Sequence, residues 1–169
     1  MLKTIGLLLL ILTGIGGGAA ASAELNRRAG FLDTACRLIG WLAVRIRYTA
    51  APIREVLSQA ADNGEFSRLS FLPEAVRRLE EGSSPEEAWG SALTPEKTVG
   101  LRESDREILK NFGRELGRSD VEGQLAHCEA FEAILKERAR AARAESVSKG
   151  KLYLTLGVAG GLCVALILL

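Results

Sequence analysis

The sequence has few of the residues on which enzymes most often rely. It contains one histidine, His127, and three cysteines whose positions match neither a disulfide framework nor a zinc-binding spacing. Cys128 follows His127 directly, but neighbours on a helix point about 100° apart and do not form a working dyad. Phosphate-binding glycine loops, paired metal ligands and a G-x-S-x-G elbow are also missing. We therefore expect no enzyme, no cofactor and no metal site.

An excess of charge of one sign is lacking as well. Only Lys3 of the 22 basic residues lies outside residues 24–151, and all 21 acidic residues lie inside this region, which therefore carries no net charge. Domains that bind nucleic acid usually show a positive excess. We expect no nucleic-acid partner and no small-molecule substrate. The unpaired cysteines favour a reducing compartment.

Strand-like alternation of polar and apolar residues does not persist anywhere, whereas helical periodicity and capping signals recur. The pattern predicts an all-α fold in which a small bundle of six helices covers residues 24–49, 52–61, 66–80, 85–93, 105–116 and 120–148. Pro73 must either kink the third helix or mark its true beginning. Ser84 and Ser104 each open a capping-box pattern, and Trp89 is the expected core anchor of the fourth helix.

Uncharged apolar segments stand at both ends of the chain. Ile5–Ala23 and Leu152–Leu169 each approach the ~20 residues that cross a bilayer as a helix. They divide the chain into an N-terminal transmembrane helix, a helical bundle domain and a C-terminal transmembrane helix, which cover residues 1–23, 24–151 and 152–169.

The flanking charges predict the side of the membrane on which the bundle lies. Basic residues follow the first segment and precede the second, whereas only Lys3 lies beyond them, so the positive-inside rule predicts a cytoplasmic bundle. The alternative is a signal peptide cleaved after Ala21-Ser22-Ala23. The protein would then be an exported helical interaction domain anchored by its C-terminal tail.

Small residues recur at four-residue spacing in both terminal segments. Gly14 and Gly18 lie in the first segment, and Gly157 and Gly161 lie in the second. This spacing lets two helix backbones approach closely. Glycine is also frequent in membrane helices, so chance spacing is the alternative to helix pairing.

Leu116–Glu122 combines a stop signal for one helix with a start signal for the next. Gly117 stands where a helix that ends at Leu116 favours a left-handed residue. Ser119 and Glu122 match a capping box, in which each side chain accepts a hydrogen bond from the other residue's amide. We expect two helices to meet here at a defined corner.

The helix that follows the corner changes character about halfway along. Its apolar stripe ends near Leu135, and Lys136–Arg143 consists of alanine and charged residues. Core burial is therefore not expected to hold the second half of this helix. The pattern predicts either a solvated basic stalk near anionic lipid headgroups or a surface that binds another subunit. The candidate partner surface consists of Arg118, Arg138, Arg140 and Arg143.

The order of these parts resembles the stage III sporulation protein AB family, over essentially the whole chain. The glycine-rich first helix, the hydrophobic last helix and the stretch Glu86–Trp89 are similar to the family's segments. The most specific resemblance is a signature at the corner, which consists of Leu116, Gly117, Ser119, Asp120 and Gln124.

The resemblance implies an assembly role. The family is similar in fold to the cytoplasmic helical domains of inner-membrane platform proteins in type II secretion and type IV pilus machines. In endospore-forming bacteria it belongs to a channel complex between mother cell and forespore, beside a secretion-type ATPase and ring-forming membrane proteins.

The resemblance therefore implies a platform subunit in the mother-cell membrane around the forespore, with its soluble domain in the mother-cell cytoplasm. Its expected partners are the ATPase, other channel proteins, the lipid bilayer and a second copy of the chain. A membrane-bound enzyme that uses Glu74, Glu80 or Glu81 is the alternative, but nothing in the sequence aligns these carboxylates with a nucleophile or a metal.

Overall fold

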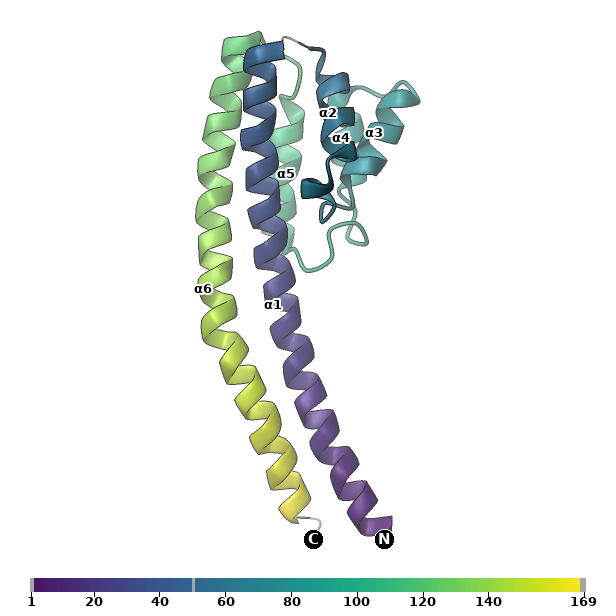
Figure 1. The fold of residues 1–169 in the computed structure, drawn as a ribbon, viewed down its shortest axis with the longest axis vertical. Coiled ribbons are helices and arrows are strands. Elements are labelled where there is room, and N and C mark those ends of the chain that lie inside the picture. Colours follow the sequence, from purple (N-terminus) through teal and green to yellow (C-terminus); the bar gives the residue numbers. More distant parts are fainter. Residues whose placement is uncertain (1, 50, 168–169) are drawn as a thin grey trace. The chain divides into compact units, whose positions relative to one another are not determined.

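The structure is a computed structural model that describes the backbone of residues 2–49 and 51–167. It describes their side chains except at residues 2–12, 14, 15, 154, 161, 162 and 164–167. The elements shown in Figure 1 are α1 (Leu2–Thr49), α2 (Ile53–Asp62), the 3-10 helix η1 (Gly64–Phe66), α3 (Leu72–Glu80), α4 (Pro85–Ala92), α5 (Glu103–Arg114) and α6 (Val121–Ile167). No strand occurs among these residues, so the predicted all-α fold is confirmed.

The chain forms two compact units. Gly30–Ala139 makes up the first, which we call the bundle unit, and Met1–Ala29 with Arg140–Leu169 makes up the second, which we call the terminal unit. The long helices α1 and α6 contribute to both units, whereas α2 to α5 belong to the bundle unit alone.

A row of aromatic rings runs through the core of the bundle unit. The Phe71 ring lies 6.2 Å from Phe31 and 5.0 Å from Trp89, and Trp89 lies 5.3 Å from Phe112. The two Trp89 contacts are edge-to-face, the arrangement that aromatic quadrupoles favour. Trp89 Nε1 donates to the Leu109 carbonyl at 2.8 Å, so the buried indole has a partner for its only polar group. Trp89 is therefore the core anchor that the sequence predicts.

Proline and serine set the beginnings of α3 and α4. Pro73 lies in the first turn of α3, so it marks the beginning of that helix, and the prediction of one helix over residues 66–80 is wrong. The reason is that proline has no amide to donate to an upstream carbonyl, which is tolerated in the first turn of a helix but not in its interior. At α4 the predicted capping box is present, because Ser84 Oγ accepts from the Glu87 amide at 3.2 Å and Glu87 accepts from the Ser84 amide at 3.3 Å.

Helix α5 begins earlier than the sequence predicts. It starts at Glu103, and Asp105 Oδ2 accepts from the Arg102 amide at 3.2 Å. The predicted capping box that opens at Ser104 is therefore wrong. Asp105 lies in the core, so its side chain turns back to the helix start instead of pointing into solvent.

In the terminal unit, α1 and α6 lie side by side and antiparallel. Ser146 Oγ donates to Asn26 Oδ1 at 2.6 Å, and Arg28 forms an ion pair with Glu145 at 3.1 Å. A Cβ added at Gly150 would lie 2.9 Å from Ser22 Oγ, so glycine permits the close approach of the two helices. Ala142 and Ser146 are buried here.

The expectation that α6 loses its buried face after Leu135 is therefore wrong. Ala139, Ala142, Ser146 and Gly150 continue the buried face at helical spacing. This buried face is hard to predict from the sequence because its residues are small. Apolar periodicity is recognised mainly from large hydrophobic side chains.

Ile5–Ala23 lies within α1, and residues 152–167 of the second apolar segment lie within α6. Across the described residues, however, neither helix has a stretch that is long and apolar enough to cross a membrane. Of the glycines predicted to pair the terminal helices, Gly18 is buried and Gly157 is half-buried. Gly14 and Gly161 lie outside the residues whose surroundings the structure describes.

Candidate functional site

The corner between α5 and α6 is built on a left-handed glycine. Gly117 has φ +78°, which confirms the predicted left-handed conformation, and Leu116 before it is buried. The prediction that the helix runs to Leu116 is wrong, because α5 ends at Arg114 and the Leu116 amide bonds only three residues back, to the Gly113 carbonyl at 3.2 Å. A Cβ at Gly117 would also lie only 3.0 Å from Ile53 Cγ2 of α2. Both the backbone conformation and the close contact therefore favour glycine at this position.

The side chain of Gln124, in the first turn of α6, holds the corner together through hydrogen bonds. Its Oε1 accepts from the Gly117 amide at 3.1 Å, and its Nε2 donates to the Glu115 carbonyl at 2.7 Å and to Ser119 Oγ at 2.8 Å. The side chain is buried, with the residue 5% exposed. It therefore hydrogen-bonds to two backbone groups after the end of α5, the Gly117 amide and the Glu115 carbonyl, which have no partner within the helix. Only a primary amide offers both the acceptor and the two donors that this site uses.

Asp120 caps the start of α6. Its Oδ1 accepts from the Gly123 amide at 2.9 Å, and α6 begins at Val121. The predicted Ser119 and Glu122 capping box is therefore wrong, because the helix begins one residue later than that box requires. Ser119 Oγ instead accepts the hydrogen bond from Gln124.

We predict that Asp120→Ala lowers the free energy of unfolding by about 1 kcal/mol, because the Gly123 amide loses its cap. Glu122→Ala is the matched control, and it should change stability by less than about 0.5 kcal/mol. Urea unfolding of the full chain in detergent, followed by far-UV circular dichroism, measures both effects. An equal loss in the two variants would mean that the capping box forms after all.

A pocket opens beside this corner, entirely within the bundle unit. Its volume is about 210 Å³, and its lining residues are Ile46, Ala51, Ile53, Gly117, Ser119, Val121 and Gln124. The polar atoms of Ser119 and Gln124 already bind each other and the backbone. The remaining walls are largely aliphatic, so the pocket suits an apolar side chain better than a charged ligand.

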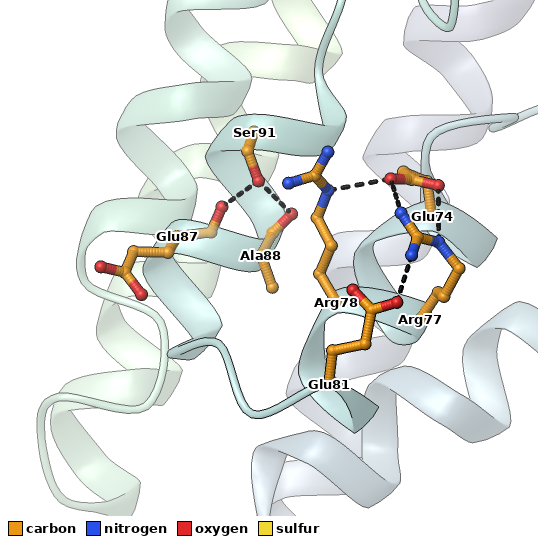
Figure 2. A network of polar contacts seen from close by, with 7 residues as sticks. All are labelled: Glu74, Arg77, Arg78, Glu81, Glu87, Ala88 and Ser91. Carbon is orange, nitrogen blue, oxygen red and sulfur yellow. Dashed lines mark hydrogen bonds and ion pairs between the residues drawn. The ribbon is translucent and has the colours of Figure 1, made fainter.

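Two of the three carboxylates of the alternative enzyme hypothesis, Glu74 and Glu81, lie in a surface network of ion pairs (Figure 2). Glu74 accepts hydrogen bonds from Arg77 Nη2 at 2.6 Å and from Arg78 Nε at 2.9 Å, and Arg77 also pairs with Glu81. The pKa of Glu74 falls to about 2, first because of the hydrogen bond from Arg77 and then because of Arg78. A carboxylate that stays ionised and paired at neutral pH is poorly suited to general acid–base chemistry.

The adjacent His127 and Cys128 face different surroundings. His127 Nε2 lies 2.9 Å from the Phe112 carbonyl, and its ring stacks on Phe112 at 5.1 Å. Cys128 is buried, and burial is the largest of the causes that raise the pKa of its thiol to about 11, ahead of the nearby carboxylates Glu132 and Glu129. Reactive cysteines show a lowered pKa instead. Among the described residues, no group of three or more His, Cys, Asp or Glu side chains could hold a metal ion.

The arginines of the candidate partner surface divide between the two units, with Arg118 and Arg138 in the bundle unit and Arg140 and Arg143 in the terminal unit. Arg118 lies at the corner and pairs with Glu86 at 3.5 Å. Arg138 lies on α6, roughly 25 Å along the helix axis from its beginning at the 1.5 Å rise per residue of an α-helix. Arg140 and Arg143 are exposed on the part of α6 that belongs to the terminal unit. Within the bundle unit, Arg118 is therefore a feature of the corner, separate from Arg138.

The whole chain is similar to one known family. The family model described as stage III sporulation protein AB matches residues 3–169. The chain belongs to this family. No curated protein and no solved structure shows significant similarity to it.

In this member of the stage III sporulation protein AB family, the structure brings all five signature residues together at the corner. Gly117, Ser119 and Gln124 form one hydrogen-bonded group, while Leu116 enters the core and Asp120 caps α6. The apolar lining of the adjacent pocket, from Ile46, Ala51, Ile53 and Val121, was not predicted. Ile46, Ala51 and Ile53 come from the stretch that joins the end of α1 to the start of α2, whereas Val121 comes from α6, and no local pattern predicts that they meet.

Proposed function

We propose that this protein is a non-enzymatic platform subunit of the channel complex between mother cell and forespore, and that it docks the secretion-type ATPase of that complex. Membership of the stage III sporulation protein AB family supports the link to sporulation. The platform role and the ATPase are what the resemblance to secretion and pilus machines implies. In this proposal Ile5–Ala23 and Leu152–Leu169 anchor the chain in the mother-cell membrane around the forespore.

The observation that carries the proposal is that residues of the family signature bond to one another at the corner. Gln124 ties together the Glu115 carbonyl, the Gly117 amide and the Ser119 hydroxyl oxygen. This hydrogen-bonded corner lies beside a largely apolar pocket. A pocket whose wall is held by hydrogen bonds suits the docking of a side chain from another protein, since preorganised pockets lower the entropic cost of binding.

The proposed contact has two parts. An apolar side chain of the ATPase enters the corner pocket between Ile46, Ile53 and Val121, and Arg118 lies in the chain between the lining residues Gly117 and Ser119. The exposed arginines of α6 form a second contact with acidic residues of the ATPase or of a sister subunit. Charges at the rim of an interface mainly steer association, so the pocket should supply most of the specificity.

The topology of the chain separates this proposal from an exported, tail-anchored domain. A reporter fused after Leu169 should behave as exported, while a reporter inserted in the loop at Glu96 should behave as cytoplasmic. We expect this result because the basic residues flank the bundle side of both apolar segments. A mature protein that begins at Glu24, or cytoplasmic activity of the C-terminal reporter, would contradict the platform topology.

A further inference from the structure

The last turns of α1 present an exposed face that contacts no other element over most of its area. Val44 is 55% exposed and Tyr48 is 79% exposed, and the half-buried Trp41 precedes them on the same face. The spacing of these residues is i, i+3 and i+7, which places them on one side of a helix. The core residues Leu42 and Ile46 occupy another side. We call Trp41, Val44, Arg45 and Tyr48 the α1 stripe.

Arg45 holds a fixed position in this stripe. Its guanidinium carbon lies 4.9 Å from the centroid of the Trp41 ring, which is the geometry of a cation–π contact. Trp41 is itself held by an edge-to-face contact with Phe66, at 5.7 Å and 70°. The cation is therefore positioned on the apolar stripe before any partner arrives.

Among the described residues, no ion pair balances the charge of Arg45. Residues 34–54 contain four arginines and no acidic residue. Arg37 pairs with Glu65 at 3.5 Å, Arg47 pairs with Glu129 at 3.6 Å, and Arg54 donates to the Leu79 carbonyl. In the part of the chain that the structure describes, no carboxylate lies within ion-pair distance of Arg45.

We infer that the α1 stripe binds an acidic amphipathic helix of a partner protein. Apolar side chains of that helix cover Val44 and Tyr48, and one of its carboxylates pairs with Arg45. Anchors at i, i+3 and i+7 are typical of a helix that packs along another helix. A nucleic acid or an anionic membrane would call for several cations side by side, whereas the α1 stripe has one cation among apolar groups. The inference rests on the proposed assembly role and names a surface separate from the corner pocket.

Site-specific photocrosslinking of the full chain in sporulating cells tests this inference. A photoreactive phenylalanine replaces Tyr48, in otherwise unchanged protein and in the variants Arg45→Glu and Arg47→Glu. Arg47 is the matched control because it lies on the same helix about 200° away from Arg45. We expect one crosslinked protein, joined through a peptide whose acidic and apolar residues follow helical spacing. Arg45→Glu should lower this crosslink at least tenfold, while Arg47→Glu should change it less than twofold.

A charge exchange completes the test. Lysine at the partner's carboxylate should restore the crosslink to the Arg45→Glu protein. The inference would be overturned by the absence of a crosslink, or by crosslinks only to lipid, nucleic acid or a second copy of the chain. It would also be overturned if Arg47→Glu lowered the crosslink as much as Arg45→Glu, or if the charge exchange did not restore it. Co-purification of the ATPase is measured in the same cells. If the ATPase does not co-purify with the unchanged protein but the crosslink at position 48 is retained, the proposed docking of the ATPase is wrong, while the inference about the α1 stripe still holds.

Discussion

Replacing Gln124 with leucine should lower the free energy of unfolding by about 2 kcal/mol. The substitution keeps an apolar body of similar size but removes the hydrogen bonds to the Gly117 amide, the Glu115 carbonyl and Ser119 Oγ, of which the Glu115 carbonyl keeps its bond from the Arg118 amide. A hydrogen bond contributes about 0.5–1.5 kcal/mol net, and three are lost here at a corner that is partly exposed to water. Urea unfolding of the full chain in detergent, followed by far-UV circular dichroism, measures the loss.

Two further variants show which atoms of Gln124 matter. Gln124→Glu keeps an acceptor for the Gly117 amide but removes both donors, so we expect an intermediate loss of stability. Ser119→Ala should cost less than about 1 kcal/mol, because the Gln124 donor still reaches the Glu115 carbonyl. Unfolding of Gln124→Leu at the same urea concentration as the unchanged protein would mean that the side chain does not fasten the corner.

Replacing Trp89 with alanine should cost about 4 kcal/mol, the largest effect that we expect from one substitution. Alanine would leave a cavity between Phe71 and Phe112, and removal of a large buried aromatic residue typically costs about 3–5 kcal/mol. The space around the indole is filled, since a Cβ added at Gly113 would lie 2.2 Å from Trp89 Cδ1. The measurement is again urea unfolding followed by circular dichroism, which does not depend on the fluorescence of this tryptophan.

Trp89→Phe is the matched variant for the hydrogen bond of the indole. It keeps most of the apolar contact with Phe71 and Phe112 but removes the donor to the Leu109 carbonyl. We expect roughly half of the loss seen with alanine. A loss below about 1.5 kcal/mol for Trp89→Ala would contradict the central place of this side chain in the core.

Local signals in the sequence predict several elements correctly because their causes lie within a few residues. Ser84 and Pro85 fix the start of α4 through a serine cap and a proline in the first turn. Gly117 marks the turn that follows α5, because a left-handed residue is needed where the chain turns after the helix. Trp89 could be recognised as an anchor from its place in a short capped helix.

Contacts between distant residues explain what the sequence does not predict. Ser119 matches the pattern of an N-cap, yet its hydroxyl is used by Gln124, and Asp120 caps α6 instead. The choice between two adjacent capping residues depends on how Gln124 reaches back to Gly117. The pocket and the buried small residues of α6 likewise depend on packing between segments far apart in the sequence.

Co-purification of the ATPase from sporulating cells, with Ala51→Trp in the full chain, tests the docking role of the corner most directly. Ala51 lines the pocket, but its side chain makes none of the hydrogen bonds of the corner, so an indole there fills the hollow and leaves Gln124 in place. A parallel variant with Arg138→Glu, Arg140→Glu and Arg143→Glu measures the contribution of the α6 arginines. If the pocket docks the ATPase, Ala51→Trp retains normal membrane levels and normal unfolding but loses at least nine-tenths of the bound ATPase, roughly 1.4 kcal/mol of binding free energy. Unchanged recovery of the ATPase with that variant would contradict docking at the corner.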